Sequence, residues 1–229
     1  METPTAGQPA GDGRRRAVLA AALVTVLLSG CSLDVRDPAA PEAAESPTVP
    51  ATPTITPGHD AEAVAAQDLP FSAGGILARG VPVGISDGLR EAPGWQVLKE
   101  NVAGEIQYLK ADGCLVSARV RGNQEALARA DDRESTVALF QYLDPTVLPG
   151  YLKTDSLRWG EDLEAPERRV EVLLLEQAAP GGRATAVMAR LFATAGSSVY
   201  VSVSCPDAPS LAGARADVAT RLQVLPPSN

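Results

Sequence analysis

The chain has 229 residues and a formal net charge of −8 at pH 7; 45% of its residues are hydrophobic and 21% are charged. An acidic surface repels phosphate backbones and anionic headgroups, so the charge argues against nucleic acid as a partner and against electrostatic docking on lipid. The length allows one domain with a substantial core plus further segments. Lysine occurs only at Lys99, Lys110 and Lys153, beside abundant Ala, Gly, Val and Arg, which is typical of a GC-rich genome such as that of an actinobacterium.

Residues 14–31 read RRRAVLAAALVTVLLSGC, a basic head followed by an apolar run. The apolar run, residues 17–28, is too short to span a hydrocarbon core of about 30 Å, which needs about 20 residues. A basic head with a short apolar core is typical of a secretory signal peptide, so we expect export with removal of residues 1–30. The arginine pair followed by Ala-Val-Leu also resembles a twin-arginine signal, and this route and the general secretory route both stay open.

The apolar run ends in Leu28-Ser29-Gly30-Cys31, which resembles the lipobox of bacterial lipoproteins. The resemblance implies a diacylglyceryl group on the Cys31 sulfur, cleavage after Gly30 and acylation of the new amino terminus. Two or more acyl chains hold a protein stably on a membrane, whereas one chain binds only marginally. We therefore expect a lipid-anchored protein on the extracytoplasmic face of the cell membrane.

A proline-rich stretch follows the lipobox. Residues 34–60 combine Pro with Ala, Thr and Glu, a composition that buries too little apolar surface to fold and favours an extended polyproline conformation. The only histidine, His59, lies in this stretch. We predict that residues 31–66 are the lipidated cysteine and a disordered tether, and that residues 67–229 form a single globular α+β domain.

Once Cys31 is acylated, the remaining cysteines are Cys114 and Cys205. An exported protein sits in an oxidising compartment, so these two are expected to form a disulfide. The bond would close a loop of roughly 90 residues and contribute on the order of 4 kcal/mol by the chain-entropy account. Two buried free thiols are the alternative.

The domain is predicted to begin with strands. A short helical turn at 61–67 precedes a strand at 81–85 and an extended piece from Trp95 to Leu98. Residues 104–110 and 114–121 flank Asp112-Gly113, a two-residue hairpin signal. The sequence therefore predicts an antiparallel hairpin here.

A helix is predicted at 132–143, because Asp131 and Asp132 supply capping oxygens and negative charge at its start. Strand signals follow at 156–159, 170–175, 184–192 and 199–205, and the last three of these are predicted to form an antiparallel meander. Ser210 is expected to cap a final helix reaching Leu222, with Val224 and Leu225 packing or pairing at the end.

This order of elements resembles the PsbP and Mog-type superfamily, and especially the LpqN/LpqT-like lipoproteins of actinobacteria. The residues that carry the resemblance are Pro93-Gly94-Trp95, Gly113-Cys114, Arg190-Leu191-Phe192 and Val203-Ser204-Cys205-Pro206. It covers about residues 81–225, and residues 69–80 and 165–169 have no counterpart in it. The resemblance implies an α/β/α sandwich around an antiparallel sheet, no catalytic residues, and binding or accessory work at an assembly.

Catalytic and metal-binding patterns are weak in this chain. With His59 in the tether, histidine-based triads and histidine zinc sites are excluded from the domain, and no phosphate-binding glycine motif occurs. We expect no cofactor and no metal. Glu161 with Asp162 or Glu164 is a carboxylate pair of the kind that a glycosidase uses, and surface solvation is the favoured interpretation of it.

Two tryptophans are the remaining candidates for contact with a ligand. Trp95 is interpreted as a core residue, whereas Trp159, flanked by Arg158 and Gly160, is equally consistent with the core and with an exposed ligand or partner contact. The sequence favours a non-catalytic interaction or accessory lipoprotein of the cell envelope. A carrier of an apolar envelope molecule, such as a lipid or glycolipid, is the alternative, and an enzyme is the third hypothesis.

Overall fold

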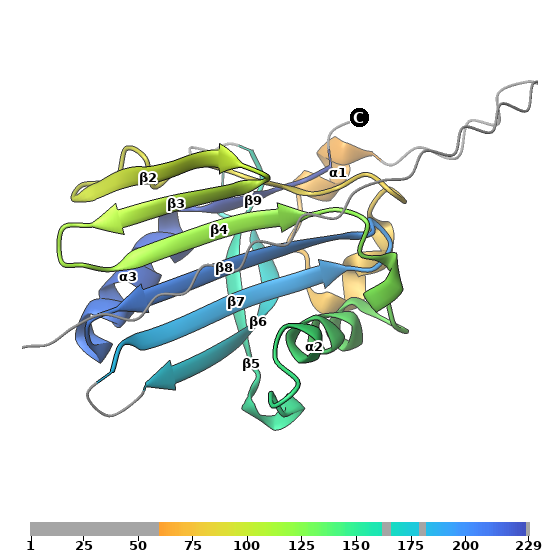
Figure 1. The fold of residues 1–229 in the computed structure, drawn as a ribbon. Helices are drawn as coiled ribbons and strands as arrows, with labels where there is room; N and C mark the ends of the chain where they lie inside the picture. Colours follow the sequence, from red (N-terminus) through yellow and green to blue (C-terminus); the bar gives the residue numbers. More distant parts are fainter. Residues whose placement is uncertain (1–59, 162–165, 179–181, 228–229) are drawn as a thin grey trace, which may run out of the picture. The chain divides into compact units, whose positions relative to one another are not determined.

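The computed structural model describes residues 60–161, 166–178 and 182–227, and over these ranges the chain is a mixed α+β fold built on one large curled sheet (Figure 1). Nine strands of the described residues pair in the order β1-β9-β5-β6-β7-β8-β4-β3-β2. Their bounds are Gly84–Ile85 (β1), Trp95–Val102 (β2), Glu105–Lys110 (β3), Leu115–Arg121 (β4), Lys153–Trp159 (β5), Arg169–Ala178 (β6), Ala184–Phe192 (β7), Ser197–Cys205 (β8) and Gln223–Leu225 (β9).

The helical elements of the described residues are few. Three are α-helices and three are short 3₁₀ segments: α1 (Ala61–Ala65), α2 (Asp132–Leu143), α3 (Ala208–Arg221), η1 (Phe71–Ile76), η2 (Glu125–Leu127) and η3 (Pro149–Tyr151). α2 begins and ends where the sequence predicts, and Asp131 caps it by accepting a hydrogen bond from the Glu134 amide. The predicted cap of α3 is wrong: Asp207 caps this helix, because its Oδ1 accepts from the amide of Ser210, which already lies in the first turn.

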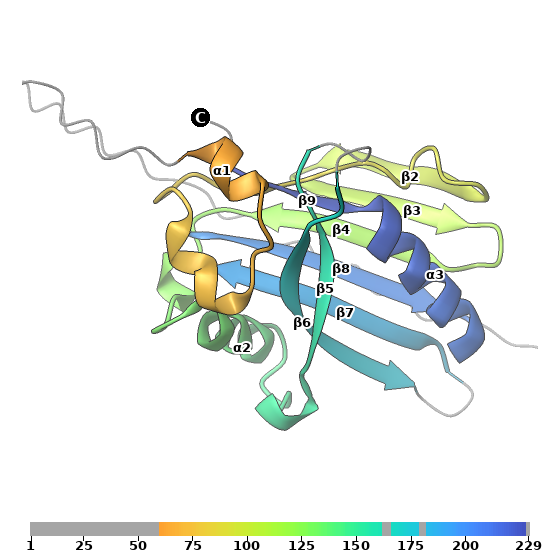
Figure 2. The same ribbon diagram turned by 180° about the vertical axis from the view of Figure 1, so that it is seen from behind.

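Most of the sheet is antiparallel, as predicted. β3 and β4 form the expected hairpin around Gly113, whose φ of 86° suits glycine, and β6, β7 and β8 form the expected meander. β9 departs from the prediction, because it pairs parallel to β5 through Arg158–Gln223 and Trp159–Val224. The parallel pair arises because α3 carries the chain back across the sheet before β9 begins (Figure 2).

One long helix lies on each face of the sheet (Figures 1 and 2). α3 packs on β5, β7 and β8 through Leu211, Ala214 and Val218, which are buried in the larger core cluster. α2 packs on β6 and β7 through Leu139 and Phe140, which belong to a second cluster. The alternation of side chains along each strand separates the two clusters and gives the sheet two buried faces.

Residues that precede the predicted domain boundary at residue 67 pack against the sheet. Val64 of α1 is buried, and its carbonyl accepts a hydrogen bond of 3.1 Å from Trp159 Nε1. Leu69 is also buried and forms a parallel bridge to Val170 in β6. The residues around α1 therefore belong to the packed domain, because a tether would leave them solvated.

Cys114 and Cys205 form a disulfide. The antiparallel register of β4 and β8 places Leu115 opposite Ser204, so the two cysteines come together one residue further along. Both cysteines are fully buried beneath α3. The bond joins β4 to the end of the meander and so links two parts of the chain that are distant in sequence.

Candidate functional site

The strands β3, β4 and β8 carry polar side chains on the face of the sheet that α2 shares. In β4, Ser117, Arg119 and Arg121 lie on this side, whereas Val116 and Ala118 are buried in the core under α3. Among the described helices, α2 contacts β6 and β7 and leaves this polar part of the face open. The sheet therefore has a covered half and an open half on the same face.

The open half is hollowed beside the C-terminal turn of α2. The hollow has a volume of about 550 Å³. We name it the polar groove, and its lining residues are Glu105, Gln107, Ser117, Arg119, Arg121, Gln124, Leu139, Tyr142, Leu143, Ser198, Tyr200 and Ser202. Three strands, α2 and the residue that precedes η2 thus contribute to one surface depression.

The groove is organised around the carboxylate of Glu105. Gln107 and Ser117 both donate hydrogen bonds to its Oε1, the latter at 2.8 Å. Its Oε2 lies 2.9 Å from Arg119 Nη2 and 3.6 Å from Lys99 Nζ. Hydrogen bonds from Gln107 and Ser117, followed by the charges of Arg119 and Lys99, outweigh the effect of burial and lower the pKa of Glu105 to about 2. Glu105 is therefore an anion at neutral pH and has no proton to give.

Arg119 is held in place over the neighbouring strand. It lies opposite Tyr200 in the β4–β8 register, and its guanidinium carbon is 5.7 Å from the centre of the tyrosine ring. Its Nε is buried and has no hydrogen-bond partner among the described residues. Burial raises the pKa of Tyr200, so this phenol stays neutral and can donate a hydrogen bond. The groove thus contains an oriented cation with unused donor capacity.

The rim of the groove is partly apolar. Tyr142 is 72% exposed and Leu143 is 53% exposed, and both line the groove from the last turn of α2. Leu148 and Tyr151, in the segment that follows α2, are also exposed. Large apolar side chains grouped in this way on a monomer's surface commonly mark an interaction site.

A second hollow of about 550 Å³ lies between β1, β2 and β9, and the arginine that lines it is already paired. Arg90, which lines it, donates to Asp87 at 2.9 Å and forms a short ion pair with Glu100. The guanidinium has two carboxylates of the same chain within reach. The polar groove is the stronger candidate, because the side chain of Arg121, which lines it, is exposed and makes no hydrogen bond or ion pair with any described residue.

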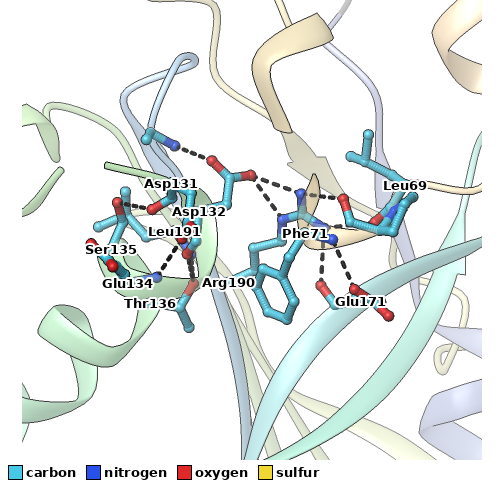
Figure 3. A network of polar contacts seen from close by, with 12 residues as sticks. Leu69, Phe71, Asp131, Asp132, Glu134, Ser135, Thr136, Glu171, Arg190 and Leu191 are labelled. Carbon is cyan, nitrogen blue, oxygen red and sulfur yellow. Dashed lines mark hydrogen bonds and ion pairs between the residues drawn. The ribbon is translucent and has the colours of Figure 1, made fainter. Parts of the chain in front are cut away.

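A buried arginine elsewhere in the sheet shows the opposite arrangement (Figure 3). Arg190 of β7 donates from Nε and Nη2 to Asp132 Oδ2 at 3.0 and 2.7 Å, and to the carbonyls of Leu69, Pro70 and Glu171. Asp132 Oδ1 accepts in turn from the Ala193 amide, which ties the start of α2 to the end of β7. The hydrogen bonds of Arg190 thus join the segment before η1 to β6 and β7.

Close packing surrounds the same pair. The guanidinium carbon of Arg190 lies 4.8 Å from the ring centre of Phe71 and 4.9 Å from that of Phe192. Gly74 lies so close to the Asp132 carboxylate that a Cβ there would collide with it. Burial lowers the pKa of Arg190, and the negative charge of Asp132 opposes this effect. The network has no accessible donor, so we assign it to the fold.

The structure places the candidate residues from the sequence in different environments. Cys114 and Cys205 are joined, and Trp95 is buried as expected, with Nε1 donating to Asp217 Oδ2 at 3.0 Å. Of the two interpretations left open for Trp159, the structure supports the core and contradicts the exposed contact: Trp159 is 3% exposed and lies 6.4 Å from Phe192, ring centre to ring centre. Its polar neighbours in sequence could not decide between the two, because β5 is flanked by paired strands on both sides.

The lipobox and part of the carboxylate set lie outside the described residues. Those residues are Leu28, Ser29, Gly30 and Cys31 of the lipobox, with Asp162 and Glu164 of the carboxylate set. Within the described ranges no three metal-ligating side chains gather, and no helix there is long and apolar enough to cross a membrane.

Comparisons with known proteins add no family to this description. No family model matches the chain, and no curated protein matches it.

The residues of the polar groove were missed at the sequence level. The signal was present in CLVSARVR, residues 114–121, where Ser117, Arg119 and Arg121 alternate with apolar residues. Such alternation predicts one polar face on a strand, but solvent and a binding groove are equally compatible with it. The rim contributed by α2 depends on tertiary packing, which the pattern of one strand does not encode.

Proposed function

We propose that the protein is a lipid-anchored interaction module of the bacterial cell envelope, and that the polar groove with its α2 rim is the surface that docks on another envelope protein. The observation that carries the proposal is the exposure of Tyr142 and Leu143 directly beside a groove of oriented polar groups. An apolar contact bordered by polar side chains is the usual composition of a protein interface.

The anchor in this proposal is the acylated Cys31, held on the extracytoplasmic face of the membrane. The lipobox at residues 28–31 supports it. In the Cys31→Ala variant, expressed in the native host, we expect loss of the processed, acylated form and of its membrane attachment. A mature, membrane-bound chain in that variant would contradict the anchor and leave the docking surface untouched.

We place the domain near the PsbP and Mog-type fold as part of the same proposal. A helix on each face of a mainly antiparallel sheet supports this placement, as does the disulfide between the β3–β4 hairpin and the end of the meander. The segment containing η1 lies outside the resemblance, and the parallel pairing of β9 with β5 departs from a wholly antiparallel sheet. The chemistry of the groove supports recognition over catalysis, because its one carboxylate is held as an anion by several donors.

The alternative function, a carrier of an apolar envelope molecule, requires a dry cavity between helix and sheet. Leu211, Ala214 and Val218 of α3 instead fill the space against β5, β7 and β8. Native mass spectrometry of the full-length protein purified from its host tests the carrier. We expect the mass of the acylated, oxidised chain alone, and additional mass from a lipid or glycolipid would favour the carrier.

The docking surface is tested by site-specific photo-cross-linking of the full-length protein in its own host. A benzophenone side chain replaces Tyr142 in one variant and Ala216, an exposed residue of α3 on the opposite face, in the control. We expect a discrete light-dependent adduct with an envelope protein from position 142 and none from position 216. No adduct from position 142, or equal adducts from both positions, would contradict the docking surface.

A further inference from the structure

We propose that the polar groove binds an acidic, extended segment of the partner protein, with a carboxylate held between Arg119 and Arg121 and an apolar side chain packed on Tyr142 and Leu143. This inference rests on the proposed function and adds the chemistry of the partner. The charges of the groove, the spacing of its arginines and its apolar rim all fit such a segment.

The polar groove has a local excess of positive charge. Its charged lining residues are Arg119, Arg121 and Glu105, and Lys99 lies within 3.6 Å of the carboxylate. Cations therefore outnumber the single anion at this place, although the whole chain carries a net charge of −8. A local excess of positive charge on an acidic protein steers and orients a partner of opposite sign.

The guanidinium groups of Arg119 and Arg121 offer hydrogen-bond donors to a ligand. Arg121 is exposed, and its side chain makes no hydrogen bond or ion pair with any described residue. Arg119 uses Nη2 on Glu105, and its side chain is 33% exposed, so part of the guanidinium stays open to the groove. A carboxylate that accepts from these groups would satisfy donors that the domain leaves unused, and charge-assisted hydrogen bonds of this kind are the strong ones.

The spacing of Arg119 and Arg121 along β4 suits one carboxylate between them. Arg119 and Arg121 are two residues apart on one strand and share a face, so their Cα atoms lie about 7 Å apart. Long arginine side chains at this separation can both reach one carboxylate between them. Ser198 and Tyr200 of β8 lie opposite Arg121 and Arg119 in the register and add hydroxyl groups to the same place.

The side chains of the rim favour a protein segment over a carbohydrate as the ligand. Carbohydrate sites stack sugar rings on flat aromatic side chains, and Tyr142 alone would suit that chemistry. The rim, however, also presents Leu143, an exposed aliphatic side chain that offers no flat ring for a sugar and can pack against an apolar side chain of a polypeptide. The combination of two arginines with Leu143 and Tyr142 therefore favours an acidic segment that also carries apolar residues.

The test selects peptides from a displayed library of random 12-residue sequences on the full-length acylated protein in detergent micelles. We expect the enriched sequences to place Asp or Glu next to a large apolar residue. For one such peptide, fluorescence anisotropy should give a dissociation constant that rises about tenfold or more in Arg121→Gln, the loss expected for one charge-assisted hydrogen bond. Arg221→Gln, which removes an exposed arginine from the end of α3, is the matched control and should leave the constant unchanged.

A double-mutant cycle sharpens the assignment. Replacing the acidic residue of the peptide by its amide should weaken binding to the wild type by a similar factor and should have little further effect on Arg121→Gln. Additive losses would place the carboxylate elsewhere and overturn the inference. Enrichment of sequences without acidic residues, equal binding by Arg121→Gln, or no enrichment at all would also overturn it.

A panel of neutral and acidic oligosaccharides serves as the competing class. Saturable oligosaccharide binding that is lost in Arg121→Gln would make the groove a carbohydrate site and overturn the inference. The inference and the proposed function can fail separately. A protein adduct from position 142 together with non-acidic selected peptides would keep the docking surface and reject its chemistry, whereas acidic peptides without any adduct in the host would reject the docking function.

Discussion

Two arginine–carboxylate pairs in this sheet have opposite surroundings. Arg190 and Asp132 are 0% and 3% exposed, and the guanidinium makes five hydrogen bonds within the domain. Arg119 and Glu105 are 33% and 11% exposed, and Arg119 has a buried nitrogen without a partner among the described residues. The first pair uses its donors to hold the fold together, whereas the second lies partly exposed in the groove beside Arg121, whose side chain makes no hydrogen bond or ion pair with a described residue.

A charge pair can be buried away from water only when protein groups satisfy all of its hydrogen-bond donors and its charge. Arg190 has the Asp132 carboxylate, three carbonyls and two aromatic rings around it. Removing one member of such a shell leaves an uncompensated charge, which costs far more than the pair contributes. Arg119 is bordered by solvent on one side, so the same loss costs less there and a ligand can complete the shell.

The largest expected effect is that of Asp132→Asn. The substitution keeps the size of the side chain but leaves Arg190 as a buried, unpaired cation, so we expect the free energy of unfolding to fall by about 3–5 kcal/mol. Urea denaturation followed by circular dichroism measures it. Asp131→Asn is the matched control, because Asn caps a helix as well as Asp does, and its expected change is about 0.5 kcal/mol or less. Equal losses in the two variants would contradict the structural role of the buried pair.

Glu105→Gln is expected to have the next largest effect, with a characteristic pH dependence. The folded-state pKa of Glu105 lies at about 2, below the ordinary value of 4.5, so the ionised form stabilises the fold above pH 4.5. This contribution is lost as the pH falls from 4.5 towards 2. We expect the variant to be less stable than the wild type by roughly 2 kcal/mol at pH 7, with the difference shrinking through that window.

Urea midpoints measured between pH 7 and pH 3 test this dependence. Glu100→Gln is the control, because Glu100 pairs with Arg90 at an exposed site, where ion pairs contribute little. A difference between wild type and Glu105→Gln that did not change with pH would show that ionisation of Glu105 has no part in stability.

A smaller effect, of opposite sign, is expected for Tyr108→Phe. The Tyr108 hydroxyl is buried without a partner among the described residues, and burial raises its pKa to about 12. Removing it should leave stability unchanged or raise it by about 1 kcal/mol, since an unsatisfied polar group is lost. Ser117→Ala removes a hydroxyl that does have a partner, Glu105, and should instead cost about 1 kcal/mol. Thermal unfolding of both variants compares them, and a clear loss of stability in Tyr108→Phe would refute the assignment.

Local signals in the sequence were sufficient for much of the fold. The cap at Asp131, the glycine turn at Gly113 and the apolar spacing of α3 each act over a few residues, and the structure has the helix, hairpin and helix face they predict. Strand alternation also predicted the meander, although β6 and β8 extend beyond the predicted ends. The disulfide followed from counting the cysteines that remain once the predicted acylation of Cys31 is set aside.

The remainder depends on contacts between distant residues. The parallel pairing of β9 with β5 follows from where α3 ends on the sheet, which no local pattern reports. Arg190 did carry a signal, because an arginine inside an apolar strand is rarely buried without a partner. That partner, Asp132, lies 58 residues away and was interpreted as part of a helix cap. The polar groove was missed for the same reason, since its two sides come from separate elements.

The most direct test of the contrast between the two pairs is Arg121→Gln, measured both for stability and for photo-cross-linking from position 142 in the host. The account predicts that the free energy of unfolding changes by about 0.5 kcal/mol or less, because the Arg121 side chain is exposed and makes no hydrogen bond or ion pair with a described residue. The yield of the adduct should meanwhile fall severalfold or more, while Arg221→Gln changes neither quantity. An unchanged adduct yield in a stably folded Arg121→Gln protein would contradict the claim that the open half of the sheet face binds the partner.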